Sequence, residues 1–203
     1  MLFKPLDTME TPDLLLRPFT AADAPALFEQ MLNDPETMHD LPFERHMTLD
    51  QTAAYIEDAE RGWRDGTLIR YALECRKTGQ LTGTIELKPA LPRIEIGVII
   101  SRRGGMRRRR AGVFALQDLV DWLIEQPGVF RVFAYCAVDG ASHSSMKRLG
   151  FVCEGLVKSY EPRPNRGLPA GDSYLFSKTR IAPQMPVPQN DGVAWLHSTL
   201  AWQ

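Results

Sequence analysis

The sequence has few cysteines and no long apolar run, and both shortages exclude classes of protein. The three cysteines, Cys75, Cys136 and Cys153, are odd in number and far apart. They can form neither the disulfide framework of a small secreted domain nor a CxxC metal clip. No apolar stretch approaches the ~18 residues that a membrane-spanning helix needs, and the first residues lack a signal-peptide pattern. We therefore expect a cytoplasmic protein that does not enter a membrane.

Histidines are scarce as well. The four are His39, His46, His143 and His197, and they form no i, i+4 pair and no HExxH arrangement. Because zinc sites draw on such clustered ligands, the sequence predicts no metal site.

The remaining composition is that of an ordinary globular chain. With 203 residues, of which 44% are hydrophobic and 24% charged, there is room for one domain and too little for a second. We expect this domain over residues 1–180. Residues 181–203 contain prolines and two tryptophans, so this tail is expected to dock on the domain or on a second subunit of a homodimer, or else to fray.

Positive charge is concentrated in one short segment. The net charge is −1, yet six of the nine residues 102–110 are arginines, and removing their six charges leaves −7 for the rest of the chain. A mildly acidic body with one cationic segment suits a compact polyanionic ligand, such as a phosphate group, better than a long nucleic acid. Nucleic-acid binding through residues 102–110 stays open as a disfavoured alternative, beside a plain solvated surface.

Hydrophobic periodicity predicts a mixed α/β chain. Apolar runs and period-two alternation predict strands over residues 14–18, 71–76, 81–87, 94–100, 131–137, 152–159 and 174–179. Helical spacing and caps predict helices over residues 20–32, 48–62, 113–125 and 142–149, the second of them ending at Gly62. Three of the strands follow one another and suggest an antiparallel meander. Neither GxGxxG nor GxxxxGK[ST] occurs, which excludes the two nucleotide folds that carry those motifs.

The arginine segment lies where an anion cradle would lie, between a strand and a helix. Residues 107–112 read Arg-Arg-Arg-Arg-Ala-Gly and precede the amphipathic helix expected from Val113. The first turn of a helix leaves backbone N–H groups unpaired at its positive dipole end. Arginine side chains add bidentate contacts to phosphate oxygens. The segment is therefore a candidate phosphate site.

Several motifs, in order along the chain, resemble one family. They are residues 14–19 (LLLRPF), 78–84 (TGQLTGT), 95–97 (EIG), 107–112, and Asp139-x-x-Ser142 followed by Leu149-Gly150-Phe151. Over about residues 12–180 the chain resembles the GNAT superfamily of acyl-CoA N-acyltransferases, and in particular its ribosomal-protein N-terminal acetyltransferase branch. The resemblance implies an α/β (α+β) fold, with a twisted, mixed, mostly antiparallel sheet of about seven strands, a central V-shaped split and about four helices.

The resemblance implies acetyl-CoA as the cofactor. The backbone of Ile99 and Ile100 would bind its pantetheine arm. Its pyrophosphate would be held by the segment Arg107, Arg108, Arg109, Arg110, Ala111 and Gly112, with Asp139 and Ser142 contributing from the later motif. Two positions depart from the family pattern. Arg110 replaces a glycine, and Asp139 replaces an asparagine, whose capping of the next helix it can reproduce but whose amide donor it lacks.

The resemblance also implies direct transfer of an acetyl group to a primary amine, either a protein N-terminus or a small molecule. An α-amine of pKa ~8 costs about 1.4 kcal/mol to deprotonate near pH 7, whereas a lysine at ~10.4 costs about 4.6 kcal/mol, so the α-amine is the easier acceptor. Ser142 is the candidate for hydrogen bonding the leaving thiolate, or else a plain helix cap. Glu95 is the candidate base, directly or through water, or else a rim carboxylate.

Two alternative functions remain open on the same residues. Met146 stands where many members of the superfamily have a tyrosine acid. Together with Arg110 and Asp139, it is compatible with a CoA-binding protein that has lost turnover, while the arginine segment is compatible with a nucleic-acid binder. In the leading interpretation the acceptor lies between residues 33–47 and residues 158–172.

Overall fold

The structure, a computed structural model, describes residues 3–103, 105–140 and 142–181, and of residues 105–109 the backbone alone. Ile181, the last described residue, is 90% exposed. The expected docking of the tail, and with it the expected homodimer, lies on residues 182–203 and therefore outside the described part of the chain.

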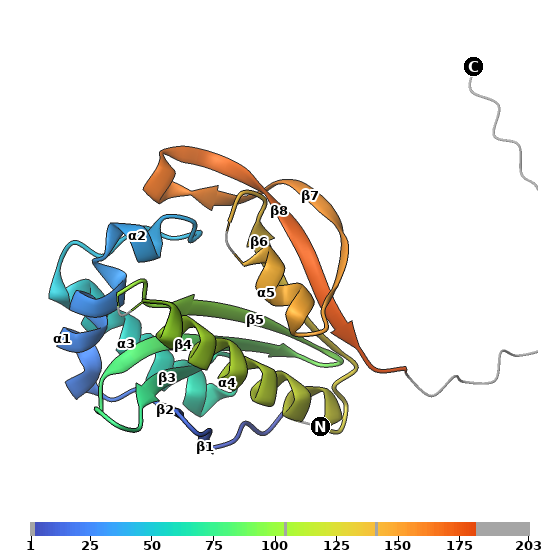
Figure 1. Cartoon of the computed structure of the whole chain (residues 1–203), viewed down its shortest axis with the longest axis horizontal. Coiled ribbons are helices and arrows are strands. Elements are labelled where there is room, and N and C mark those ends of the chain that lie inside the picture. Colours follow the sequence, from blue (N-terminus) through green and yellow to red (C-terminus); the bar gives the residue numbers. More distant parts are fainter. Residues whose placement is uncertain (1–2, 104, 141, 182–203) are drawn as a thin grey trace, which may run out of the picture.

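A single eight-stranded sheet forms the centre of the molecule (Figure 1), in the order β1-β2-β3-β4-β5-β6-β8-β7. The strands are β1 (Met9–Glu10), β2 (Leu14–Pro18), β3 (Ile69–Cys75), β4 (Leu81–Ala90), β5 (Arg93–Ile100), β6 (Arg131–Ala137), β7 (Val152–Arg163) and β8 (Leu168–Thr179). All neighbours are antiparallel except β5 and β6. The mixed, mostly antiparallel sheet is thus confirmed. The strand missing from the sequence expectation is β1, whose two residues are too few to show a periodicity.

The predicted split of the sheet is present between β5 and β6. These strands pair only where Arg93–Glu95 run beside residues 131–133. We call these three residue pairs the joint. Beyond the joint, β5 continues to Ile100 and β6 to Ala137 without pairing to each other. Figure 1 shows β6, β7 and β8 diverging from β2 to β5, so that the sheet consists of two arms that meet at the joint.

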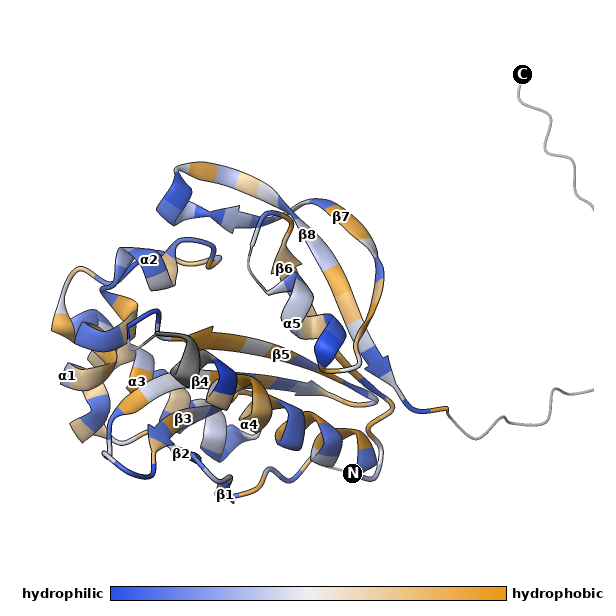
Figure 2. Ribbon diagram, in the orientation of Figure 1, coloured by the Kyte–Doolittle hydropathy of each residue, from blue (hydrophilic) through white to orange (hydrophobic). Residues whose placement is uncertain are grey.

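Helices lie on both faces of the sheet. They are α1 (Ala24–Leu27), α2 (Pro35–Met38), α3 (Leu49–Asp65), α4 (Gly105–Glu125) and α5 (His143–Arg148). The amphipathic helix α4, whose alternating hydropathy is visible in Figure 2, buries Leu116, Leu119 and Leu123 against one face of the sheet, and α5 joins it there through Met146. On the other face α1 and α3 form a second apolar cluster, which includes Leu27 and Ile56.

Helix α2 has no counterpart in the sequence expectation, where Pro35 follows the end of the first helix, and two helix boundaries also differ. Helix α3 continues past Gly62 and ends at Asp65, with Gly66 as a left-handed cap at φ 68°. Gly62 is a packing glycine, because a Cβ there would lie 2.6 Å from Cβ and 2.7 Å from the carbonyl oxygen of Leu68. Helix α4 begins at Gly105 and not at Val113. The arginine run is helical because arginine is a good helix former and nothing in the run breaks a helix.

Candidate active site

The free edge of β5 is the first feature of the site. From Ile96 to Ile100 this strand pairs with β4 on one side and with no strand on the other. Its outward N–H and C=O groups are therefore open to a ligand that brings its own amides. Ile99 and Ile100 lie on this edge with their side chains packed into the two apolar clusters. Binding of a pantetheine arm by their backbone stays a prediction.

The N-terminus of α4 follows directly after that edge. The first four N–H groups of a helix have no intrahelical partner and lie at its positive end, which here means residues 105–108. The prediction that the amides of residues 107–112 all face a ligand is wrong in part, since the amides of residues 109–112 belong to the helix interior. Arg110 is exposed. The side chains of residues 107–109 lie outside the described part of the chain.

Gly112 has a packing role on the first arm. A Cβ at this position would lie 2.6 Å from Cδ1 of Ile100. The neighbouring Ala111 also packs against the apolar cluster beneath α4. These two small residues let the first turns of α4 lie close against β5, and so bring the helix N-terminus to the free strand edge.

Ser142 stands on the opposite side of the split, at the start of α5. It occupies the N-cap position, but its backbone is helical (φ −79°, ψ −20°) and its side chain makes no capping hydrogen bond. Caps normally adopt extended backbone angles, so Ser142 stands at the cap position without capping the helix through its side chain. The hydroxyl is hydrogen bonded to the thiol of Cys136, whose pKa is raised by burial and only partly lowered by that bond. The residue is exposed and available to a ligand.

Asp139 has a partner that the sequence did not indicate. Its two carboxylate oxygens accept hydrogen bonds of 2.8 and 2.6 Å from Arg166, which lower the pKa of Asp139. The expectation that Asp139 can cap α5 is wrong, because Ser142 holds that position. Arg166 explains why an acidic residue is tolerated here. No local pattern could have revealed it, since the two residues are 27 positions apart.

Glu95 lies at the joint, on the face of the sheet that carries α1 to α3. Its Oε1 is 3.3 Å from Nζ of Lys88, which also lies 3.2 Å from Glu86. Burial opposes the charge of Lys88, but the two carboxylates outweigh it and raise the pKa of the lysine. Glu95 is 31% exposed and lines a cavity of about 310 Å³ together with Lys88, Ala90, Arg93, Phe133, Tyr135 and Tyr160.

The sequence of the chain matches a known protein family. Residues 13–152 match the family described as the acetyltransferase (GNAT) domain. The chain belongs to this family. Its open sheet, with one parallel pair and a split beyond it, is the fold of solved GNAT structures.

This GNAT chain is similar in sequence to one curated protein and similar in fold to solved acetyltransferases. An uncharacterized N-acetyltransferase, YoaA of Bacillus subtilis (strain 168), is 28% identical over 156 residues, which are 75% of this chain and 86% of YoaA. The microcin C7 self-immunity acetyltransferase MccE, solved with acetyl-CoA and AMP, has a TM-score of 0.73 at 14% identity over 84% of this chain and 94% of its own. The ribosomal-protein-S5-alanine acetyltransferase of Vibrio fischeri has a TM-score of 0.71 at 16% identity, with 85% and 96% covered.

Two tyrosines that sequence reasoning missed stand beside Glu95 in this GNAT site. The rings of Tyr135 on β6 and Tyr160 on β7 stack with centroids 4.0 Å apart. The irregular register of β7 around Ser159, whose φ is 48°, lets Tyr160 reach a strand that is not its neighbour. Burial, and then the Tyr135 hydroxyl, raise the pKa of Tyr160, so this phenol keeps its proton. Met146, in contrast, is buried under α5.

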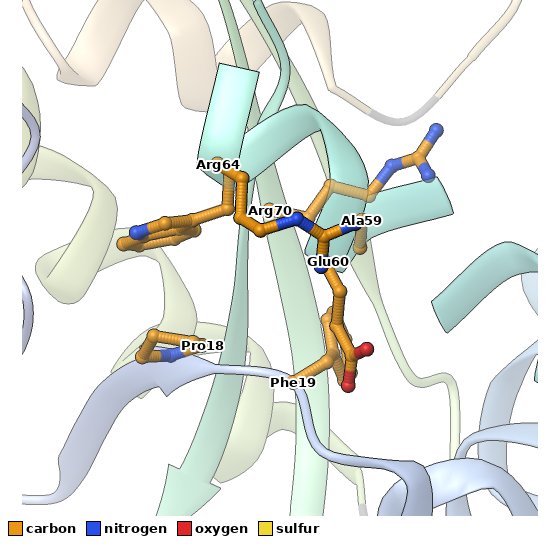
Figure 3. A pocket seen from close by; sticks show the side chains of 7 residues that line it. Pro18, Phe19, Ala59, Glu60, Arg64 and Arg70 are labelled. Atoms are coloured by element: carbon orange, nitrogen blue, oxygen red, sulfur yellow. The ribbon is translucent and has the colours of Figure 1, made fainter. Parts of the chain in front are cut away.

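A second cavity lies away from the split. It measures about 240 Å³ and is lined by Pro18, Phe19, Ala59, Glu60, Trp63, Arg64 and Arg70. Figure 3 shows the α3 side chains Glu60 and Arg64 on one side of it, with Pro18 and Phe19 on the other. None of the candidate site residues lines this cavity.

The described ranges contain neither a metal-binding cluster nor a membrane-crossing helix. No group of three or more His, Cys, Asp or Glu side chains converges there on a point that could hold a metal ion. Of the helices in the same ranges, none combines the length and the hydropathy of a membrane-crossing segment.

Proposed function

We propose that this GNAT acetyltransferase transfers the acetyl group of acetyl-CoA to a primary amine, which is a protein N-terminus or a small molecule. The observation that carries the proposal is the continuity between the unpaired edge of β5 and the N-terminus of α4. An elongated ligand with amides along its length and a phosphate group at its end suits both features. MccE, which has the same fold, is solved with acetyl-CoA.

The residues of this chain fit such a cofactor. The free backbone edge at Ile99 and Ile100 can take the amides of a pantetheine arm, and the unpaired amides of residues 105–108 can take a pyrophosphate. The exposed Arg110 adds positive charge at the same helix end. A glycine at position 110 is not needed for close approach, because this position already lies inside the helix.

Proton handling falls to side chains on either side of the split. Acetyl-CoA, when bound, supplies an activated thioester. Glu95 lies in a cavity with one exposed side and takes the proton of the acceptor amine, directly or through water. The hydroxyl of Ser142 donates to the leaving sulfur once it turns from Cys136. Tyr135 and Tyr160 supply further hydroxyls beside Glu95, where the buried Met146 offers none.

The acceptor is proposed to lie on the Glu95 face, between residues 33–47 and residues 158–172. Carboxylates on this side, among them Glu95 and Asp40, suit an incoming ammonium group before it loses its proton. The low cost of deprotonating an α-amine near neutral pH favours a chain N-terminus over an internal lysine.

Thiol release from acetyl-CoA tests the proposal. The purified chain is incubated with acetyl-CoA and a panel of peptides, polyamines and aminoglycosides, and both free thiol and acetylated product are followed. We expect release that depends on one class of primary amine. Tight binding of acetyl-CoA without amine-stimulated release would favour a CoA-binding protein without turnover. Steeply salt-dependent binding to DNA that acetyl-CoA does not alter would favour the nucleic-acid alternative.

A further inference from the structure

The two arms of the sheet meet again far from their joint, through side chains at the turn between β7 and β8. This turn is the short 3₁₀ helix Pro164–Arg166, closed by Gly167 in a left-handed conformation at φ 67°. The backbone joint between β5 and β6 covers three residue pairs only. Beside this joint and the apolar cluster that both arms share beneath α4, the contacts that cross between the far ends set the separation of the arms there.

Asn165 makes three such contacts with residues that follow α2 or end it. Its Nδ2 donates to the carbonyl oxygens of Met38 at 2.7 Å and of Phe43 at 2.9 Å. Its Oδ1 accepts from the backbone N–H of Arg45 at 2.8 Å. The amide thus uses both its donor and its acceptor side on backbone groups that lie 120 or more positions away in the sequence.

Arg166 extends this connection to the turn before α5. It binds Asp139 with two hydrogen bonds and lies 3.8 Å from Asp40. Gly140, next to Asp139, lies so close that a Cβ on it would be 3.6 Å from Asp40 Oδ2. Three segments, residues 38–45, 139–140 and 165–166, therefore meet at one place. We call Asn165, Arg166 and their partners the clasp.

The hairpin that carries the clasp is held firmly. Arg163 is only 2% exposed, and it donates to Ser173 at 2.6 Å and to Glu161 at 3.1 Å. Ser173 in turn donates to Glu161 at 3.0 Å. Because Ser173 on β8 bonds both partners of this ion pair on β7, the two strands are tied together and the turn that follows presents Asn165 in a defined position.

We propose that Asn165 is a positioning residue that sets the width of the acceptor entrance, and thereby which amines reach Glu95. This rests on the proposed function, which puts the acceptor between the two segments that the clasp joins. With the clasp closed, the entrance admits slender amine-bearing groups such as a chain N-terminus with a small first residue. With the clasp broken, the arms separate and broad acceptors enter as readily.

The proposal is tested by comparing the acetylation of two acceptors that carry the same kind of amine but differ in width. Peptides that are identical except for an alanine or a tryptophan at the N-terminus serve if the wild type acetylates peptides. In Asn165→Ala we expect the KM for the slender peptide to rise about tenfold and its advantage over the broad one to fall about tenfold. Acetyl-CoA affinity, measured by calorimetry, should stay within about twofold.

Two further variants separate positioning from general damage to the fold. Asn165→Asp keeps the size and the acceptor, but sets a carboxylate against two carbonyl oxygens, and should behave like Asn165→Ala. Val152→Ala, on an exposed residue of β7, should leave the peptide preference at the wild-type value. A loss of stability alone lowers activity towards both peptides equally, so an unchanged preference in a folded Asn165→Ala would overturn the proposal.

Hydrogen exchange gives a readout that needs no turnover. The backbone N–H of Arg45 is protected by Asn165 and should exchange about tenfold faster in Asn165→Ala than in the wild type or in Val152→Ala. An equal exchange rate would mean that the clasp does not form, and would overturn the proposal. If the wild type releases no thiol with any amine, the proposed function fails instead, and the specificity argument fails with it while the exchange result still reports on the clasp.

Discussion

The two arms of the sheet are held in place by different forces. The first arm, β1 to β5, has an apolar cluster on each face, built by α4 on one side and by α1 and α3 on the other. The second arm, β6 to β8, is covered by the six-residue α5 and exposes large apolar side chains such as Val152 and Leu156. One face of this arm shares the apolar cluster beneath α4 through Val132 and Phe176. At its far end the arm is tied to the first arm by the polar contacts of the clasp, while the ion pairs of Arg131 and Arg163 brace it internally.

Because of this difference, the two arms are suited to different roles in the proposed site. Hydrophobic burial is non-directional and tolerant, so it suits an arm that has to offer a constant strand edge and helix end to the cofactor. Hydrogen bonds and ion pairs are directional, and each depends on single side chains. The second arm is therefore the one whose geometry is more sensitive to a single polar substitution, and this sensitivity is the basis of the proposed control of acceptor preference.

The largest expected effect is on stability, in a pair of leucine truncations. Leu119→Ala, in the core beneath α4, should lower the free energy of unfolding by about 3 kcal/mol because it leaves a cavity. Leu156→Ala, on the exposed face of β7, should cost less than about 0.5 kcal/mol. Urea unfolding of both variants measures the difference. Similar losses in the two arms would contradict the comparison.

At the joint between the arms, Glu95→Gln should lower kcat about 100-fold, since the amide cannot accept the proton of the acceptor. The affinity for acetyl-CoA should be unchanged, because Glu95 lies on the face away from α4. Glu60→Gln, which changes a carboxylate at the second cavity, is the matched control and should keep wild-type kcat. Steady-state kinetics with the best amine checks both. A wild-type kcat in Glu95→Gln would leave Glu95 as a rim carboxylate.

On the first arm, Gly112→Ala should cost about 1–2 kcal/mol and weaken acetyl-CoA binding, because the new Cβ displaces α4 from β5. Ile100→Val removes Cδ1, the atom that the new Cβ would meet at 2.6 Å. The double variant should therefore recover most of the stability and the affinity. Urea unfolding and calorimetry of the two single variants and the double one form the cycle. Losses that simply add would show that this contact is not the cause.

The smallest effect concerns an ion pair of the second arm and depends on pH. Arg131 holds Glu154 through two bonds of 2.6 Å, and its hydrogen bonds, together with one from Ser177, lower the pKa of Glu154 to about 2. Because the folded-state pKa is depressed, the stabilisation is present above the usual value of 4.5 and is lost as the pH falls towards about 2.

Glu154→Gln should therefore be less stable than the wild type by under about 1 kcal/mol at pH 7, since the pair is partly exposed. The difference should shrink below pH 4.5 and vanish near pH 2. Urea midpoints of both proteins across this range measure it. A difference that does not vary with pH would show that the charge of Glu154 contributes nothing.

Most of the fold could be predicted from the sequence, because its signals are local. Period-two alternation gave seven of the eight strands, and the order of motifs predicted the split. The failures also have local causes. Gly62 looks like a helix terminator, but the space it provides is for Leu68, a contact that the sequence does not reveal. The arginine run looks like a loop because of its charge, although arginine favours helices.

The site could be predicted only in part, because some of its residues depend on distant partners. Glu95 and Ser142 carry local motifs and both lie at the split. Tyr160 reaches Tyr135 only through the irregular backbone at Ser159. Asn165 lies in a turn with no recognisable motif, and its partners are backbone groups far along the chain.

The short joint between β5 and β6 makes the second arm a lever. On β8, Ser177 lies opposite Phe133 and therefore at the joint, whereas Leu168 lies at the hairpin tip. At ~3.3 Å per residue, Ser177 and Leu168 are about 30 Å apart. A rotation of about 5° at the joint would move the tip by about 2.6 Å over that length. Glu95 lies at the joint, where the displacement is smallest. A small rotation of the second arm would thus change the space at the hairpin tip while the carboxylate of Glu95, the proposed base, stays nearly still.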